Sequence, residues 1–357
     1  MESRTYGDLA RRFESNPLLK PQDVRPSHGD WMVESLLNPA AFMYKGRVGL
    51  LLRVAERPPH EEGWVSTPLF DPQADGGVRI LRVRRDDPDL KFKSDEPRIF
   101  EYRGHTYLTT LSHLRLAWSD DGRHFQAEQK PTLVGEGEYE SFGIEDCRVT
   151  ELEGRFILTY SAVSSYGVGV GMASTSDWRS FQRLGMILPP HNKDCAVLPR
   201  RAGGLYQALH RPSGVGFGGN NIWIASSPDL INWGSHRCLA ATRDGHWDAE
   251  RIGAGAAPIE TPKGWLEIYH GANAKSRYCL GALLLDLENP QRVIARSDRP
   301  IMEPLAPYEL TGFFGNVVFT NGQVVRGDEV TVYYGAADSV VCGATFSIRE
   351  LIDSLPG

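Results

Sequence analysis

The fold of this chain can be inferred from the segment Asp146-Cys-Arg-Val-Thr-Glu-Leu-Glu-Gly154 and from its repetition elsewhere. The segment begins with a charged side chain, continues as an alternating apolar run and ends at a glycine. A second apolar run, Phe156-Ile-Leu-Thr-Tyr160, follows the glycine. Alternation with a period of two residues and a turn at glycine predict a β-hairpin whose first strand carries Asp146 at its entrance.

Six segments along the chain follow this pattern, which indicates a repeat architecture. They are the segments that begin at Asn38, Glu96, Asp146, Asp194, Ala257 and Asn316. The spacings between successive starts are 58, 50, 48, 63 and 59 residues, which is the size of a four-stranded propeller blade. The sequence therefore predicts an all-β chain, and the repeat favours a β-propeller over a sandwich.

We expect a single β-propeller catalytic domain over residues 1–357, with little helix. Short helices are predicted over residues 5–15, as an N-terminal extension, and from Ser347 to Ser354. Six repeat starts imply six blades, unless the segment that begins at Glu96 is an extra hairpin of the first blade.

The composition is that of an ordinary globular protein, with 24% charged and 41% hydrophobic residues and a net charge of −6. This charge argues against a surface for nucleic acid or for an anionic membrane, and no apolar run is long enough to span a bilayer. The five cysteines are scattered, as expected for reduced cysteines in a cytoplasmic protein. No sequence pattern indicates a cofactor or a metal ion.

In a propeller the innermost strands begin around a central funnel, so polar residues at the repeat starts should meet there. These residues are Asn38, Asp146, Asp194 and Glu260. A second set ends the strands that return toward the funnel: Arg53, His210, Arg211, Tyr269, His270 and Asp338. Carboxylates and arginines beside aromatic residues are typical of a sugar site, because aromatic faces stack on sugar rings and charged groups bond hydroxyls. The alternative for each Asp or Asn is a turn residue that bonds only local backbone.

Seven motifs occur along the chain in a fixed order. They are Gly143-Ile-Glu-Asp-Cys-Arg-Val-Thr150, Asn192-Lys-Asp-Cys-Ala-Val-Leu-Pro199, His210-Arg-Pro212, Arg251-Ile-Gly-Ala-Gly-Ala-Ala-Pro-Ile259, Gly264-Trp-Leu-Glu-Ile-Tyr-His-Gly271, Leu283-Leu-Leu-Asp-Leu-Glu-Asn-Pro290 and Tyr333-Tyr-Gly-Ala-Ala-Asp338. In this order they resemble the motifs of glycoside hydrolase family 130, whose members are five-bladed propeller enzymes that act on β-mannosides. The resemblance extends from Asn38 to Leu355.

The resemblance implies an inverting mechanism with one catalytic acid, which by motif match is Asp146. It also implies a β-mannoside oligosaccharide as the substrate. Asn38, Arg53 and Asp338 match the family positions that hold the terminal mannose. Lys193, Arg211 and His270 match the basic positions on the side from which phosphate or water attacks.

One departure from the family pattern bears on the reaction. Many phosphorylases of the family carry a lysine in a Pro-Pro-Ile-Lys-Thr motif, and Glu260 stands at that place here, in Ala257-Pro-Ile-Glu-Thr261. A carboxylate repels phosphate, whereas an inverting hydrolase needs a second carboxylate, about 6.5–9.5 Å from the first, to activate water. We therefore expect hydrolysis, with Glu260 or Glu267 as the general base.

The alternative reaction is phosphorolysis, in which inorganic phosphate is the co-substrate and mannose 1-phosphate is released. Lys193 and Arg211 favour this alternative. A non-catalytic sugar-binding propeller and a five-bladed furanosidase are more distant alternatives. The sequence leaves open the linkage of the substrate, its length and whether the protein forms a homo-oligomer.

Overall fold

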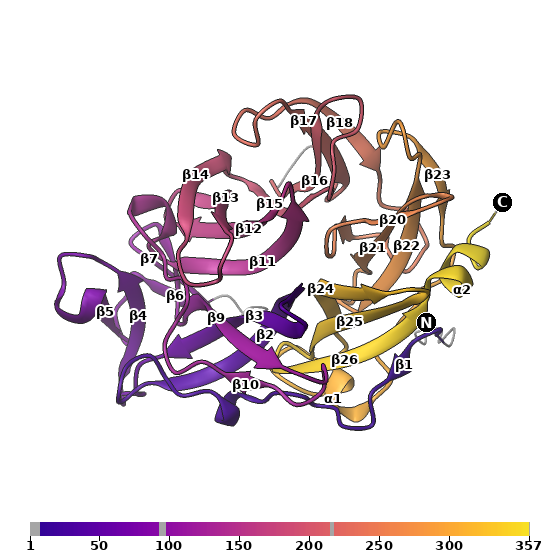
Figure 1. Ribbon diagram of the computed structural model, residues 1–357. Helices are drawn as coiled ribbons and strands as arrows, with labels where there is room; N and C mark the ends of the chain where they lie inside the picture. Colours follow the sequence, from indigo (N-terminus) through magenta and orange to yellow (C-terminus); the bar gives the residue numbers. More distant parts are fainter. Residues whose placement is uncertain (1–7, 93–97, 215–217, 357) are drawn as a thin grey trace.

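The computed structural model describes residues 8–92, 98–214 and 218–356. Its strands form a ring of five blades (Figure 1). The eight-stranded sheet contains blades 1 and 2, which are joined where Ser112 and Gly143 pair in parallel, and three further sheets supply one blade each. The prediction of an all-β, five-bladed propeller is confirmed.

The strands of the ring follow one another in chain order. Blade 1 has β2 (Met32–Tyr44), β3 (Arg47–Arg57), β9 (Leu111–Ser119) and β10 (Gln126–Ala127), and blade 2 has β11 (Gly143–Leu152), β12 (Arg155–Ser164), β13 (Gly167–Thr175) and β14 (Gln182–Leu188). Blade 3 has β15 (Asn192–Val197), β16 (Tyr206–Pro212), β17 (Ile222–Ser227) and β18 (Gly234–Ala240), and blade 4 has β19 (Arg251–Gly253), β20 (Ile259–Thr261), β21 (Gly264–Ala272), β22 (Tyr278–Leu285) and β23 (Val293–Arg296). Blade 5 has β24 (Val318–Arg326), β25 (Glu329–Ala336), β26 (Val340–Ser347) and, from the N-terminal side, β1 (Arg11–Arg12).

The remaining elements are an insertion in blade 1 and a few single helical turns. The insertion has β4 (Trp64–Phe70), β5 (Val78–Arg84), β6 (Leu90–Phe92), β7 (Ile99–Tyr102) and β8 (His105–Leu108). The helices are η1 (Pro21–Asp23), η2 (Asp75–Gly77), η3 (Glu138–Glu140), α1 (Pro307–Leu310) and α2 (Ile348–Asp353). None of these described helices is long and apolar enough to cross a membrane.

The inner strands of blades 1, 2 and 3 share a β-bulge that positions a polar residue. One extra residue interrupts the pairing of β2, β11 and β15, and the bulges contain Asn38, Asp146 and Asp194. These three residues have left-handed backbone, with φ of 26°, 49° and 53°. Asn and Asp adopt this conformation more readily than other non-glycine residues, which explains why they occupy the repeat starts. The inner strands contact one another around the centre of the ring (Figure 1).

The inner strand of blade 4 departs from this pattern. β19 pairs with β21 as far as Gly253, and pairing resumes only at Ile259 in β20. The break of residues 254–258 is longer than the bulges of the other blades. The repeat that begins at Ala257 is therefore out of step with the others, and Glu260, which pairs with Trp265, lies beyond the position of the bulge.

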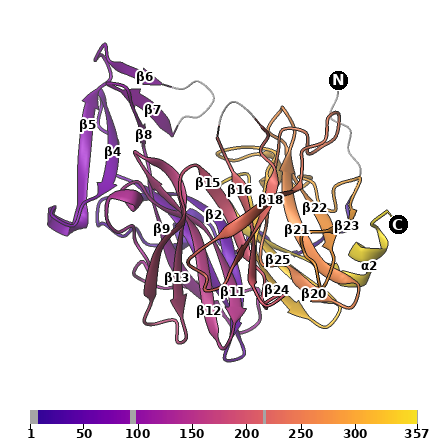
Figure 2. The ribbon, with the colours of Figure 1, turned by 90° about the horizontal axis from the view of Figure 1, so that it is seen from above.

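The repeat that begins at Glu96 is part of the insertion and not a blade. Glu96 and Pro97 lie outside the described residues, and Ile99–Tyr102 of that repeat forms β7, which pairs with β6 and β8. Figure 2 shows this small sheet, together with the β4–β5 hairpin, projecting from the ring. The interpretation of an extra hairpin is thus confirmed, and a sixth blade is wrong.

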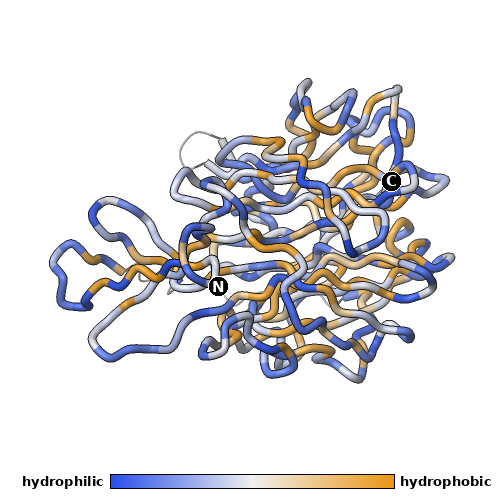
Figure 3. Tube along the Cα trace, turned by 60° about the vertical axis from the view of Figure 1, so that its left-hand side comes forward, coloured by the Kyte–Doolittle hydropathy of each residue, from blue (hydrophilic) through white to orange (hydrophobic). Residues whose placement is uncertain are grey.

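Hydrophobic residues follow the strands of the blades, while hydrophilic residues gather in the turns (Figure 3). One buried cluster joins Ile268 of blade 4 to Val332 and Tyr334 of blade 5. Another joins Leu51 of blade 1 to Leu158 of blade 2. Blade-to-blade packing of this kind fixes where the inner strands stand relative to one another.

The outer turns of blades 1, 2 and 3 are built alike, each around an aspartate. Oδ1 of Asp121, Asp177 and Asp229 accepts hydrogen bonds from the backbone N–H groups two and three residues further on. The residue after the aspartate has left-handed backbone in every case. This residue is a glycine in blade 1, but in blade 2 it is Trp178, with φ of 58°. A non-glycine residue in this conformation is strained, and it points the indole in a fixed direction.

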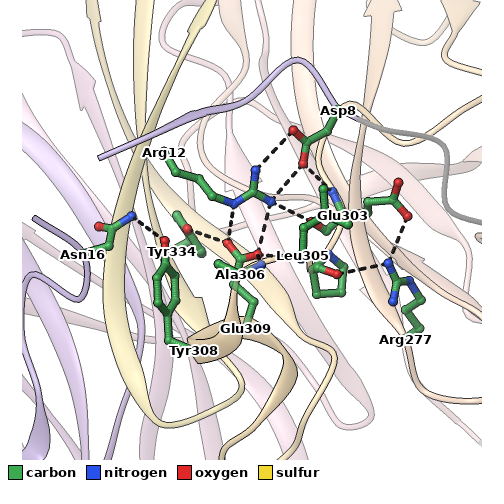
Figure 4. A network of polar contacts seen from close by, with 11 residues as sticks. Asp8, Arg12, Asn16, Arg277, Glu303, Leu305, Ala306, Tyr308, Glu309 and Tyr334 are labelled. Atoms are coloured by element: carbon green, nitrogen blue, oxygen red, sulfur yellow. Dashed lines mark hydrogen bonds and ion pairs between the residues drawn. The ribbon is translucent and has the colours of Figure 1, made fainter. Parts of the chain in front are cut away.

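The N-terminal segment was expected to be helical, and this expectation is wrong for its described part. Residues 8–15 contain no helix, and β1 pairs with β26 at the edge of blade 5, where Arg11 lies opposite Thr345. The buried carboxylate of Glu309 accepts Arg12 Nε at 2.8 Å and the hydroxyl of Tyr334 at 2.7 Å (Figure 4). An ion pair across the sheet edge thus outweighs local helical preference. The predicted C-terminal helix is confirmed as α2, which Ser347 caps by accepting the N–H of Glu350.

We expect Arg12→Ala to lower the free energy of unfolding by about 3 kcal/mol, because it leaves the buried carboxylate of Glu309 without its cation. The neighbouring substitution Arg11→Ala is a matched control, since Arg11 pairs with the exposed Glu350 and should contribute less than about 1 kcal/mol. Urea unfolding of both variants measures the difference. Equal losses of stability in the two would contradict the anchoring of β1 by Arg12.

Candidate active site

Asp146 lies at the centre of a cluster of charged side chains between blades 1 and 2. Its Oδ1 accepts hydrogen bonds from Asn38 Nδ2 and from Arg53 Nη1, both at 3.1 Å. Arg53 also donates to Glu145 Oε1 at 2.6 Å, so one guanidinium joins two consecutive carboxylates. Ser112 Oγ donates to the same oxygen of Glu145 at 3.2 Å. The structure thus brings together Asn38, Arg53 and Asp146, as the sequence predicted.

The charge of Asp146 is set by its neighbours. Burial raises the pKa of this carboxyl, but the positive charges of Arg53, Arg148 and Lys193 and the hydrogen bond from Asn38 outweigh burial and lower it. Asp146 is therefore ionised at neutral pH in the protein without ligand. The other amide atom of Asn38, Oδ1, is buried and accepts no hydrogen bond within the described part of the chain.

Asp194 is the second buried carboxylate of the site, and cations surround it. Arg148 Nη2 donates to Oδ1 at 3.0 Å, and Arg211 Nε donates to Oδ2 at 2.7 Å. His270 Nε2 lies 3.4 Å from Oδ2. Burial opposes ionisation, but Arg211 and Arg148 hold the pKa of Asp194 well below its usual value.

Arg148 links the backbone of Asp146 to the carboxylate of Asp194. Its side chain is buried, and Nη1 donates to the backbone carbonyl of Asp146 at 2.8 Å while Nη2 bonds Asp194. The same guanidinium donates to the carbonyls of Ala254 and Gly255, in the break of the inner strand of blade 4. Blades 2, 3 and 4 therefore meet at this one side chain.

Burial lowers the pKa values of two basic residues of the cluster, Lys193 and His270. Burial is the main cause that lowers the pKa of Lys193, and the nearby charge of Arg211 adds to it. Burial also lowers the pKa of His270 to about 4, so its ring is neutral at pH 7. Gly253 packs directly against this group, because a Cβ at that position would collide with Asp194 Oδ2 and with the His270 ring.

Asp338 approaches the same cluster from blade 5. Its backbone is left-handed, with φ of 50°, and its charge acts on the guanidinium of Arg53. Asp338 Oδ2 lies 4.0 Å from Nη2 of Arg98, which belongs to the insertion in blade 1. The guanidinium of Arg98 also lies over the rings of Phe313 and Phe314, at 5.1 and 5.2 Å from their centroids. Blades 1 and 5 thus approach each other beside Arg53.

Three residues predicted for the site lie elsewhere. Glu260 is exposed and pairs with Arg200 at 2.9 Å, so it does not face Asp146. His210 and Tyr269 each precede a residue of the cluster in its strand, and successive side chains of a strand point to opposite faces. His210 therefore contacts Asn192 and His236, and the hydroxyl of Tyr269 bonds Asp248. The sequence identified the correct strands but, at these two positions, the wrong face.

Glu267 is fully buried, and its Oε1 accepts the N–H of Gly255 at 2.8 Å. Burial raises its pKa to about 8, despite the opposing effects of the Gly255 N–H and of Arg148. The structure thus places Glu267 against the backbone that Arg148 holds, as a support of the cluster and not at its surface.

Several residues of the cluster were not assigned to the site from the sequence. Arg148 and Arg251 occur in motifs that the sequence analysis quoted, and Arg251 donates to the hydroxyl of Tyr278 at 3.1 Å. Asn220 accepts from Arg211 at 3.4 Å. Their motif context could have indicated the two arginines, whereas nothing local distinguishes Asn220. Over the described ranges, no group of three or more His, Cys, Asp or Glu residues is placed to hold a metal ion.

Comparisons with known proteins agree with this fold. Residues 92–356 match the model of glycoside hydrolase family 130, which is described as beta-1,4-mannooligosaccharide phosphorylase. The chain is 42% identical over 349 residues to the beta-1,2-mannobiose phosphorylase of Listeria innocua serovar 6a, with 96% of this chain and 98% of the relative covered. It is 36% identical over 248 residues to the 1,2-beta-oligomannan phosphorylase of Thermoanaerobacter sp. strain X514, with 69% and 82% covered.

Solved structures lead to the same result. The structure of the Listeria innocua beta-1,2-mannobiose phosphorylase in complex with beta-1,2-mannobiose superposes with a TM-score of 0.92, at 42% identity, and covers 97% of this chain and 99% of that one. The Listeria innocua relative and its structure match nearly the whole chain, and the family model matches most of it. The chain therefore belongs to glycoside hydrolase family 130 as an enzyme of that family.

Proposed function

We propose that this enzyme is a β-1,2-mannoside phosphorylase, which cleaves the terminal β-mannosidic bond with inorganic phosphate and releases mannose 1-phosphate. The observation that carries the proposal is the pair of cations at this site: the charge of Lys193 acts on Asp146, and the charge of Arg211 acts on Lys193. The two carboxylates expected to activate water do not face Asp146, because Glu260 pairs with Arg200 and Glu267 is buried against Gly255. The expectation of hydrolysis rested on Glu260, which lies on the surface with Arg200. The names of the relatives support phosphorolysis and the β-1,2 linkage.

In the proposed reaction an oxygen of phosphate attacks the anomeric carbon of the terminal mannose. The bond from that carbon to the departing sugar breaks, and the departing oxygen takes a proton that originates from Asp146, directly or through a substrate hydroxyl. Attack from the opposite face inverts the anomeric configuration, so the product is the α-phosphate of mannose.

Asp146 must be protonated to act as this acid, although its pKa is lowered in the free protein. Bound phosphate would bring negative charge next to Lys193 and Arg211 and would offset the field that keeps Asp146 ionised. Phosphate would thus serve both as the nucleophile and as the partner that raises the pKa of the acid.

The opposite side of Asp146 suits a sugar. Asn38, Arg53 and Asp338 offer an amide, a guanidinium and a carboxylate, which together bond sugar hydroxyls as donors and acceptors. The free amide oxygen of Asn38 is an acceptor that a mannose hydroxyl would satisfy.

The test of the proposed function is the dependence of the rate on phosphate. With β-1,2-mannobiose as substrate, cleavage should rise from near zero to a plateau as phosphate is added, and mannose and mannose 1-phosphate should appear in equal amounts. The reaction should also run backwards from mannose 1-phosphate and mannose. A rate that does not change with phosphate, with mannose as the only product, would establish hydrolysis instead.

Asp146→Asn should lower the turnover by on the order of 10²–10⁴-fold, since an amide cannot supply the proton. Glu260→Gln makes the same chemical change outside the site and should keep nearly normal turnover. Initial rates of both variants at saturating phosphate provide the comparison, with thermal unfolding as the check that each is folded. A strong loss in Glu260→Gln would show that Glu260 takes part after all.

Lys193→Met should raise the KM for phosphate by about ten- to a hundredfold, because a charge-assisted hydrogen bond to an anion contributes about 1.5–3 kcal/mol. The KM for mannobiose should change much less. Lys263→Met, at an exposed lysine on blade 4, serves as the control and should leave both constants unchanged. If Lys193→Met changed the KM for mannobiose and not that for phosphate, Lys193 would belong to the sugar side.

A further inference from the structure

A second concave site lies at the opposite ends of the strands that carry the active site. It is a depression of about 370 Å³ between blades 1 and 2. The β2–β3 turn, the end of β9 and the Asp177 turn of blade 2 form its walls. Arg47 in this depression is six residues before Arg53 on β3, a separation of about 20 Å along an extended strand. The depression is thus distinct from the cluster around Asp146.

Aromatic rings dominate the depression. Tyr44 and Trp118 are partly exposed, and their ring centroids are 6.2 Å apart with an angle of 44° between the planes. Trp178, the strained residue of the Asp177 turn, lines the depression and stacks on Phe42 with centroids 3.5 Å apart. Its indole Nε1 is buried and has no hydrogen-bond partner within the described ranges. Because this nitrogen is buried, the depression offers a ligand ring surface rather than this donor, and the partly exposed rings are those of Tyr44 and Trp118.

The polar groups around the rings are of both signs. Glu128 Oε1 accepts the indole N–H of Trp118 at 3.0 Å, and Asp177 also lines the depression. Lys45 lies over the ring of Tyr44, and Arg47 lies over Trp118 while it pairs with Asp120. Three cations and two carboxylates line the depression, and Asp120 beside Arg47 balances the third cation. Exposed aromatic rings with mixed donors and acceptors suit an uncharged ligand rich in hydroxyls.

We propose that this depression is a second, non-catalytic carbohydrate site, which holds a stretch of the oligosaccharide chain while the active site acts on a chain end. Sugar rings would stack on Trp118 and Tyr44, and their hydroxyls would bond Glu128, Asp177 and Arg179. The identity of the sugar as a β-mannoside rests on the proposed function, whereas the aromatic platform does not. Such a site would raise the local concentration of long substrates and would be indifferent to mannobiose.

Electrophoresis through gels that contain soluble β-mannan tests the proposal with the whole protein. The wild type should be retarded, and Trp118→Ala should require a roughly tenfold higher mannan concentration for the same retardation, as expected for the loss of one stacking ring. Phe92→Ala removes an exposed ring from the insertion and is the matched control, which should remain retarded. Phosphorolysis of mannobiose by all three should be equal.

Trp118 packs edge-on against Phe42, so Trp118→Ala can also disturb the fold. Glu128→Ala and Arg179→Ala keep the ring and should each weaken the retardation, and thermal unfolding identifies any variant that is not folded. Retardation that is absent in the wild type, or unchanged in all the folded variants, or lost equally in Phe92→Ala, overturns the proposal. Phosphorolysis of mannobiose by the wild type is measured separately, because its absence would contradict the proposed function and not the second site. Gels that contain xylan or glucan then show whether Trp118 and Tyr44 bind other sugars.

Discussion

The buried ion pair between Arg148 and Asp194 is the interaction on which the rest of the site depends. The guanidinium also holds the backbone of Asp146 and two carbonyls of blade 4, so it fixes three blades against one another. Separating such a pair leaves an uncompensated charge in a dry interior, which is strongly unfavourable. The geometry of the acid is therefore tied to the geometry of the ring. Glu267 also supports this arrangement, because its carboxylate accepts the N–H of Gly255, whose carbonyl Arg148 binds.

The site is built from balanced charges that a ligand can rearrange. Arg53 joins Glu145 and Asp146, and Arg211 and Arg148 share Asp194. Each of these three arginines thus has a carboxylate partner, which offsets the cost of burying its charge. A bound anion must compete with these carboxylates for the cations. Each cation that turns toward the anion weakens its ion pair with a carboxylate and so raises the pKa of that carboxylate. Binding and proton affinity are in this way two aspects of one charge balance.

The sequence predicted the blades and much of the site because the decisive signals are local. Asn38, Asp146 and Asp194 repeat at blade spacing, and the left-handed bulge explains why these residue types recur. What local signals could not supply is the face toward which a side chain points. His210 and Tyr269 are one residue away from members of the cluster, and a strand alternates its faces. Glu260 was misplaced because the break in blade 4 is longer than the other bulges, and the segment around Arg11 was taken for a helix because its partner strand is more than 300 residues away.

The pairing of β1 with β26 also affects the order in which the ring can form. β1 precedes the blade strands β2 to β25 in the sequence, and β26, on which it lies, follows them all, so β1 is synthesised well before its partner. Contacts between such distant segments form late, because a very long loop must close before they are gained. β26 begins two residues after Asp338, so the pairing that completes blade 5 also places Asp338 at the sugar pocket. A chain whose ring is not yet joined would therefore have four blades in place and still lack an active site.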